Sequence, residues 1–240
     1  MICIMKKILT FLVCITLNHM TYAEDLQCEK SYAEFNQYLT DLNNIGKNGD
    51  VAQLDKFLEK TEYSRLFKTK HQNQIYYNTD WINKQEYQLA LQFQTGLTKS
   101  DQYQHIKFNL QPPKANFILS VGEVCVVPWT SEDKIFNKTY VSQTDLIFVR
   151  DLKNNQWRSF TYLGTEKPED FKEFFPHFPI ALKLSAATAN GTYAVTDQAY
   201  EMGINMFDHL TNSTIPPVLI EELTKNVELN RQRLKANGFN

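Results

Sequence analysis

The first part of the chain carries an apolar residue at every third or fourth position. This spacing runs through residues 29–45 and resumes after Asp50. Because an α-helix turns once in about 3.6 residues, apolar positions with this period lie on one helix face, and Asp is a favoured N-cap. The pattern predicts two amphipathic helices joined by the segment GKNG. Their apolar faces consist of Tyr32, Phe35, Leu39, Leu42 and Ile45, and of Val51, Leu54, Phe57 and Leu58.

Further along the chain, apolar and polar residues alternate one by one. The segments EYQLALQF (86–93) and YQHIKFNL (103–110) show this period of two. Alternation places successive side chains on opposite faces of a β-strand, so we interpret both segments as strands with one polar face. The segment FILSVGEVCVVP (117–128) is expected to form one long strand, with a bulge at Gly122 and an end at Pro128.

Two later segments are apolar on both faces. In TDLIFV (144–149) the four residues Leu-Ile-Phe-Val fill both faces, and WRSFTYL (157–163) carries aromatic residues on both. A strand of this kind lies in the middle of a sheet that is covered on both sides. The two segments therefore predict a central hairpin. ALKLS (181–185) is a candidate for a short last strand.

The last third of the chain predicts helices separated by proline. PEDFKEFFPHFP (168–179) indicates a short acidic helix that Pro176 stops. Helical spacing recurs over residues 194–210 and again from about Val218 to Ala236, with TNSTIPP (211–217) as the linker between them.

The terminal helix has a near-heptad apolar stripe, Ile220, Leu223, Val227 and Leu234. Such a stripe usually packs onto its own domain. The alternative is an assembly role, in which the stripe binds a partner.

Two helices followed by a meandering antiparallel sheet predict an α+β fold. This order of elements resembles the NTF2-like cone fold. The stretch GEVCVVP…VSQTDLIFVRDLKNNQWRSFTYL…FKEFFPHFP resembles the last strands of small exported NTF2-like bacterial proteins of unknown function. The likeness covers about residues 30–185 and implies an N-terminal helical hairpin packed on a curved antiparallel sheet. Asn154 and Asn155 stand where these proteins have glycines, and asparagine tolerates the positive φ of such a turn.

The start of the chain has the layout of a secretory signal peptide. Lys6 and Lys7 precede an apolar run that is too short to span a bilayer, and Ala23 offers a cleavage site. We expect cleavage after Ala23, with an uncleaved anchor as the alternative. Cys14 lies inside the apolar run and does not follow a small residue, which argues against a lipoprotein. The predicted organisation is a signal peptide (1–23), an α+β domain (24–185) and a helical extension packed on it (186–240).

The net charge and the cysteines of the mature chain indicate which partners and which cellular compartment to expect. Loss of residues 1–23 removes two lysines and no acidic residue, so the formal charge changes from −2 to −4. This charge gives no reason to bind nucleic acid or an anionic membrane. Cys28 and Cys125 remain, and in an oxidising compartment such a pair is expected to form a disulfide. The alternative is a buried thiol at Cys125 and a free Cys28. We expect a periplasmic monomer or homodimer.

Motifs that carry chemistry are scarce. The four mature histidines, His71, His105, His177 and His209, have no metal-ligand spacing, and the sequence contains no nucleophile elbow, P-loop or dinucleotide motif. We therefore expect no metal and no cofactor. Residues 131–134 match SxxK, but this segment is interpreted as a solvated loop.

The resemblance implies a pocket in the mouth of the cone, where some members of the fold use an Asp or His base with a Tyr donor. The residues of these types in the relevant half are Tyr140, Asp145, Tyr162 and His177. An isomerase-, dehydratase- or hydrolase-like enzyme would need at least two of them in one cavity, because geometry comes before pKa. We assign no catalytic residue from the sequence.

Aromatic residues beside prolines are the best candidates for binding. They are Trp129, Phe174, Phe175 and Phe178, with Tyr140, Tyr162 and His177 as further candidates in the cavity. Aromatic residues held in loops are common interface anchors, although they can equally cap the core. The sequence favours an exported, non-enzymatic binding protein that acts through a protein or an envelope component, for example as an immunity protein against a delivered toxin. The alternative is a protein that binds a small apolar ligand, or an enzyme, in the cone cavity.

Overall fold

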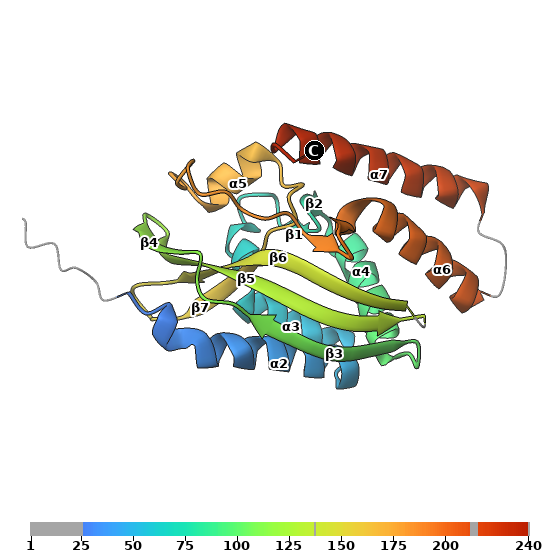
Figure 1. Ribbon diagram of the computed structural model, residues 1–240, viewed down its shortest axis with the longest axis horizontal. Coiled ribbons are helices and arrows are strands. Elements are labelled where there is room, and N and C mark those ends of the chain that lie inside the picture. Colours follow the sequence, from blue (N-terminus) through green and yellow to red (C-terminus); the bar gives the residue numbers. More distant parts are fainter. Residues whose placement is uncertain (1–25, 137, 212–215, 240) are drawn as a thin grey trace, which may run out of the picture.

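The computed structural model describes residues 26–136, 138–211 and 216–239, with no side-chain description for 206–211 and 219. The predicted signal peptide and residues 212–215 of the predicted linker lie outside these ranges. The described part is an α+β structure, as the sequence predicts (Figure 1). Among the described residues, no helix combines the length and the apolar character needed to cross a membrane.

Helices come first along the described chain, interrupted by one short hairpin. The elements in this part are η1 (Glu29–Ser31), α2 (Tyr32–Asn48), α3 (Val51–Thr61), η2 (Tyr63–Phe67), β1 (Ile75–Tyr77), β2 (Asp80–Ile82) and α4 (Lys84–Lys99). The predicted helical hairpin is present as α2 and α3. Asp50 caps α3, and its side chain accepts a hydrogen bond from the backbone N–H of Gln53.

The predicted strand at residues 86–93 is wrong, because this segment lies inside α4. Tyr87, Leu91 and Thr95 are buried at intervals of four residues, whereas Leu89 and Phe93 are 58% and 51% exposed. The alternation was therefore accidental, since only every second of its apolar residues faces the core. Asn83 and Glu86 form a reciprocal capping box, and this signal for a helix start was present in the sequence.

A seven-stranded antiparallel sheet follows, built around one long hairpin. Its strands are β3 (Tyr103–Leu110), β4 (Ala115–Leu119), β5 (Gly122–Ile135), β6 (Lys138–Arg150), β7 (Trp157–Thr161), β8 (Thr188–Ala189) and β9 (Thr192–Tyr193). β5 and β6 pair along their whole length. β4 and β3 share the outer edge of β5, and β7 and β8 share that of β6.

The segment 117–128 is two strands rather than the single strand that the sequence predicted. Leu119 pairs with Gly122 across a tight turn, so Gly122 begins β5 and is not a bulge within it. Pro128 does not end β5, which continues to Ile135. The proline is tolerated because its outer side falls between the stretch paired with β4 and the stretch paired with β3. Its carbonyl oxygen accepts a hydrogen bond from the Gln111 N–H at 2.9 Å, and no N–H donor is needed at this position. The SxxK segment is therefore part of a strand and not a loop.

Both faces of the central hairpin are covered, as its apolar pattern predicts. One face packs on α2 through Phe35, whose ring stacks on Phe148 with centroids 3.8 Å apart. The opposite face carries Val124, Ile147 and Phe160 and packs on β1, η2 and the segment that includes α5 (Pro168–Phe174). Figure 1 shows α2 and α3 on one side of the sheet and α5 with β1 and β2 on the other.

The C-terminal part adds two strands and two helices. The predicted short strand at 181–185 is wrong, because this segment is irregular and the strand lies later, at β8. After β9 come η3 (Ala194–Gln198), α6 (Ala199–Thr211) and α7 (Pro217–Ala236). The stripe of α7 faces the protein: Val227 and Leu234 are buried, and Leu223 lies 3.2 Å from the position of a Cβ at Gly203 of α6.

A disulfide joins Cys28 and Cys125, so the predicted pairing is confirmed. Beside it, the buried Glu123 carboxylate contacts the Arg150 guanidinium at 2.7 Å. Its other oxygen accepts hydrogen bonds from the backbone N–H groups of Gln27 and Cys28, at 2.7 and 3.0 Å. The start of the described chain is thus tied to β5 both covalently and through a satisfied buried charge.

Candidate functional site

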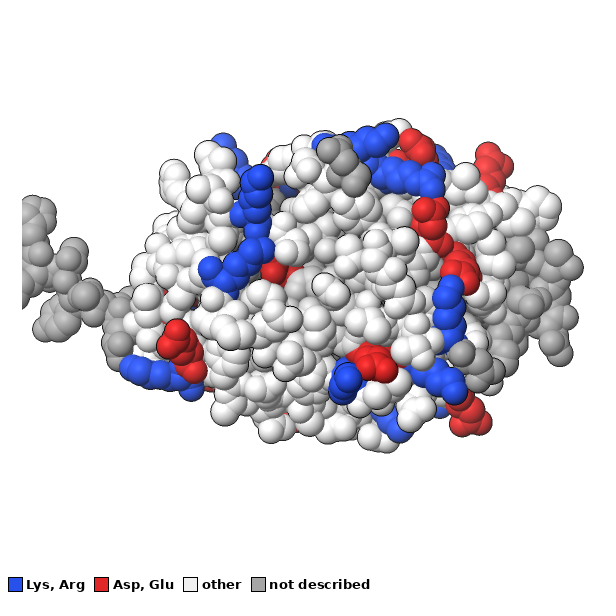
Figure 2. All heavy atoms as spheres, viewed as in Figure 1, with Lys and Arg blue, Asp and Glu red and all other residues white. Residues whose placement is uncertain are grey.

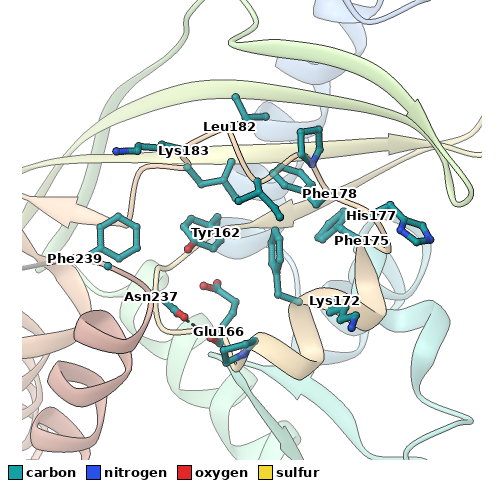
Figure 3. A pocket seen from close by; sticks show the side chains of 16 residues that line it. Tyr162, Glu166, Lys172, Phe175, His177, Phe178, Leu182, Lys183, Asn237 and Phe239 are labelled. Atoms are coloured by element: carbon teal, nitrogen blue, oxygen red, sulfur yellow. Dashed lines mark hydrogen bonds between the residues drawn. The ribbon is translucent and has the colours of Figure 1, made fainter.

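A cavity of about 840 Å³ lies between the turn that follows β7, α5, the segment 175–184 and the end of α7 (Figure 3). Its walls are mostly apolar and aromatic. The lining residues are Tyr162, Glu166, Pro168, Phe171, Lys172, Phe175, His177, Phe178, Pro179, Ile180, Leu182, Lys183, Leu184, Asn237, Gly238 and Phe239.

The aromatic wall follows from the short length of α5. Pro168 occupies the first turn of this helix, where the missing N–H costs nothing, and the helix ends at Phe174, before Pro176. The chain then turns through His177, which has a positive φ of 63°. This turn brings Phe178 back against Phe171 and Phe175, with ring centroids 5.2 and 6.0 Å away. The rings make offset and edge contacts that hold this side of the cavity.

One carboxylate lies in this apolar surround. Glu166 is 2% exposed, and its side chain points into the cavity toward Tyr162 (Figure 3). One oxygen accepts a hydrogen bond from the backbone N–H of Leu163 at 2.6 Å, and the other from that of Gly164 at 2.8 Å. Burial raises the pKa of the Glu166 carboxyl to about 7, although the backbone N–H groups of the turn oppose this rise.

Tyr162 provides a hydroxyl in the same cavity. Burial raises the pKa of Tyr162, and the nearby carboxylates of Glu166 and Asp145 raise it further. The phenol therefore stays protonated at neutral pH and offers an O–H donor, beside a carboxyl group that changes charge near neutrality.

The end of α7 closes the cavity opposite α5. The Asn237 amide donates hydrogen bonds to the backbone oxygens of Gly164 and Glu166, at 3.0 and 2.9 Å. Phe239 then places its ring 6.3 Å from that of Tyr162 and 6.2 Å from that of Tyr193. Asn237 therefore holds the turn that carries Glu166, and it also fixes the end of the chain that places Phe239 in the cavity wall.

The mouth of the cavity combines basic and apolar groups. Lys172, His177 and Lys183 are exposed, and in Figure 3 their side chains extend away from Glu166. Ile180 is fully exposed. Figure 2 shows basic side chains gathered on this face of the molecule, in the area between β4 and α5 of Figure 1.

The structure brings four of the predicted binding residues to this cavity: Tyr162, Phe175, His177 and Phe178. Phe174 points elsewhere, into the core beside Phe67 and Tyr76. Trp129 packs in the cluster around Phe35. Tyr140 is buried near the other end of β6, where the Lys138 ammonium lies 5.4 Å from its ring.

Two of the four residues of the enzyme hypothesis, Tyr162 and His177, line this cavity, with His177 exposed at its mouth. Tyr140 and Asp145 do not line it. Asp145 is fully buried, and one of its oxygens accepts hydrogen bonds from the Lys114 ammonium at 2.8 Å and the Ser185 N–H at 2.7 Å. Tyr140 and Asp145 are five residues apart on one strand and so point to opposite faces. The described residues contain no group of three or more His, Cys, Asp or Glu side chains able to hold a metal ion.

Sequence reasoning missed Glu166, Phe171, Asn237 and Phe239. Glu166 lies in the polar run GTEKPED, which resembles any solvated turn. Asn237 and Phe239 follow the last helix, 71 and 73 positions beyond Glu166, and no local pattern links them. Phe171 alone had a signal, since it shares a helix face with Phe174 and Phe175 in a segment already singled out.

Protein-family models, curated proteins and solved structures were each compared with the chain, and none of them matches it.

Proposed function

We propose that this protein is a non-enzymatic binding protein that holds a small, largely apolar molecule in the cavity between α5 and the end of α7. The observation that carries the proposal is the cavity of about 840 Å³ with its aromatic walls and single buried carboxyl. Ligand pockets typically measure about 300–1,000 Å³ and combine an apolar lining with a few placed polar groups.

The cavity supports a small molecule better than a protein partner. Of the aromatic residues predicted as interface anchors, Phe174 and Phe175 are at most 1% exposed, and Trp129 and Phe178 are partly buried. Buried rings cannot insert into a partner without unfolding α5. They can form the wall of a cavity, and Phe175 does so.

The setting we infer is the periplasm, after export and removal of residues 1–23. The disulfide supports an oxidising compartment.

We also assign the chain to the NTF2-like cone fold. The order of α2, α3, the β1–β2 hairpin, α4 and then an antiparallel sheet supports this assignment. A second cavity of about 260 Å³ lies between the helical layer and β7, where Tyr38, Leu58 and Phe160 contribute to its walls.

The test is direct detection of the bound molecule and of the cavity that holds it. The mature chain, residues 24–240, is purified from the periplasm and extracted with organic solvent, and the extract is analysed by mass spectrometry. Binding of the neutral apolar dye N-phenyl-1-naphthylamine is then measured by fluorescence. We expect a co-purified apolar compound and saturable dye binding at one site.

A cavity-filling variant identifies the site. Leu184→Trp places an indole in the cavity and should abolish dye binding. The matched control is Leu66→Trp, because Leu66 is 54% exposed and does not line this cavity. Equal dye binding by the two variants, or a tight stoichiometric protein partner in a periplasmic pull-down together with no dye binding, would contradict the proposal.

A further inference from the structure

The Glu166 carboxylate lacks a partner cation of the kind that the buried carboxylates of Glu123 and Asp145 have. Glu123 is paired with Arg150 at 2.7 Å, and Asp145 is paired with Lys114 at 2.8 Å. Among the described residues, Glu166 makes no ion pair, and its hydrogen bonds come from backbone N–H groups of its own turn. Burying an ionised carboxylate without a partner charge is costly, so a missing cation at this position needs an explanation.

Asp170, in the first turn of α5, is the other buried carboxylate of the described residues without an ion pair. It differs in position, because one of its oxygens accepts a hydrogen bond from the Trp81 indole at 3.0 Å and it does not line the cavity. Glu166 is therefore the carboxylate that a molecule in the cavity would meet.

The groups around Glu166 are those that recognise an organic cation. Backbone N–H groups of its own turn donate to the Glu166 carboxylate, among them those of Leu163 at 2.6 Å and Gly164 at 2.8 Å, and none of these donors carries a positive charge. Tyr162 and Phe171 have ring centroids 5.7 Å apart, and Phe175 lies 5.0 Å beyond Phe171. Aromatic faces attract ammonium groups through the ring quadrupole, and they do so more strongly where water is excluded.

We propose that the ligand of this cavity is an organic cation, a protonated amine or a quaternary ammonium on an apolar body, whose charged end meets Glu166 between the aromatic rings. This inference rests on the proposed function and narrows its ligand class. The basic side chains at the mouth, Lys172 and Lys183, extend into solvent, where salt screens them. Glu166 is therefore the charged group that lies inside the cavity.

Binding of such a cation depends on the charge of Glu166. A carboxyl group whose pKa lies at about 7 is mostly protonated at pH 6 and mostly ionised at pH 8. A permanently charged ligand should therefore bind about tenfold more weakly at pH 6 than at pH 8. The titratable and charged groups that face Glu166 or line the cavity are Tyr76, Tyr162, Lys172, His177 and Lys183, with the Asp80–Arg233 pair beyond Tyr76.

The test uses two probes of the same shape, benzyltrimethylammonium and its neutral carbon isostere, neopentylbenzene. Equilibrium dialysis against the mature chain gives the dissociation constant of each at pH 6 and pH 8. At pH 8 we expect at least about tenfold tighter binding of the cation. This preference should disappear in Glu166→Gln, and only the cation should lose affinity at pH 6.

One control variant tests whether the pH dependence belongs to Glu166. His177→Gln removes the imidazole at the mouth of the cavity and should keep the pH dependence. If Glu166→Gln does not fold, the comparison of the two probes on the unaltered protein still decides the question. Equal binding of both probes would overturn the cationic ligand and leave the apolar binding function intact. Failure of both probes and of the neutral dye would overturn the binding function and the cation together.

Discussion

Gly164 has a left-handed backbone conformation, in the turn that carries Glu166 into the cavity. Its φ is +88°, and a Cβ there would lie 2.3 Å from the Cβ of Ala186. Its N–H donates a hydrogen bond to Glu166, and its carbonyl oxygen accepts one from Asn237. The position therefore joins the turn, the buried carboxylate and the end of α7, and only glycine fits it.

We predict that Gly164→Ala lowers the free energy of unfolding by about 2–4 kcal/mol, because a left-handed alanine costs about 1–2 kcal/mol and the clash with Ala186 adds to it. Urea unfolding followed by circular dichroism measures the change. The control is Gly191→Ala, at φ +80° with nothing within 4 Å of the added Cβ, which should cost only the backbone part. Equal losses in the two variants would show that the clash at Ala186 is relieved.

Single residues differed in how far the sequence could predict them. The positive φ at Asn155 was foreseen, and its value is 58°. That prediction depended only on the local preference of asparagine for such a turn. The burial of Glu166 could not be foreseen, because it depends on Phe171 and Phe239, which the chain brings together only after folding.

Among the elements, α4 shows why an alternating pattern can mislead. Its sequence places apolar residues at 87, 89, 91 and 93. The full set fits one face of a strand, and positions 87 and 91, which are four residues apart, also fit one face of a helix. Length and capping decide between them, because a 16-residue element with the Asn83–Glu86 box is a helix. The central hairpin was predictable because both of its faces are apolar, whereas β8 and β9 are two residues each and carry no periodic signal.

One side chain near the end of α7 links the helix to the β1–β2 hairpin. Arg233 contacts both carboxylate oxygens of Asp80 at 2.9 Å and the Thr79 hydroxyl at 3.1 Å. Two residues earlier on the same helix, Arg231 pairs with Asp197, and both of these side chains are exposed. The two arginines therefore offer a matched comparison of a docking contact and a surface contact.

We predict that Arg233→Ala destabilises the protein by about 1 kcal/mol, a modest value because Asp80 is 40% exposed and water screens the pair. Amide hydrogen exchange over α7 should become faster, since the helix loses its contact with the β1–β2 hairpin. Arg231→Ala should change stability by less than about 0.5 kcal/mol and leave exchange unaltered. Unchanged exchange in Arg233→Ala would mean that apolar packing alone holds α7.

At the scale of the whole molecule, the disulfide closes a long loop that joins the N-terminal helical layer to the start of β5. Cys28 and Cys125 are 97 positions apart, and the chain between them includes every helix of the N-terminal layer. Their pairing was predictable from export and from the even number of mature cysteines. The overall α+β class was predictable as well, because it follows from the order of periodicities and not from any single contact.

We predict that the Cys28→Ser, Cys125→Ser double variant loses up to about 4.7 kcal/mol of unfolding free energy, because the unfolded chain regains the entropy of a loop of this length. Urea unfolding with and without a reductant measures the loss. The reductant should destabilise the natural protein by the same amount and have no effect on the double variant. If the fully reduced natural protein has the same unfolding free energy as the oxidised protein, the estimate is contradicted.

The division of the outer edge of β5 between β3 and β4 has a consequence for association between copies. A foreign chain that adds to a sheet needs a long, uninterrupted border of free backbone groups. Here the border runs for eight residues along β3 and for five along β4, and Leu110 and Ala115 mark the break between them. Lys107 lies on the longer piece. The break and the charged side chain therefore limit this edge of the sheet as a template for edge-to-edge aggregation.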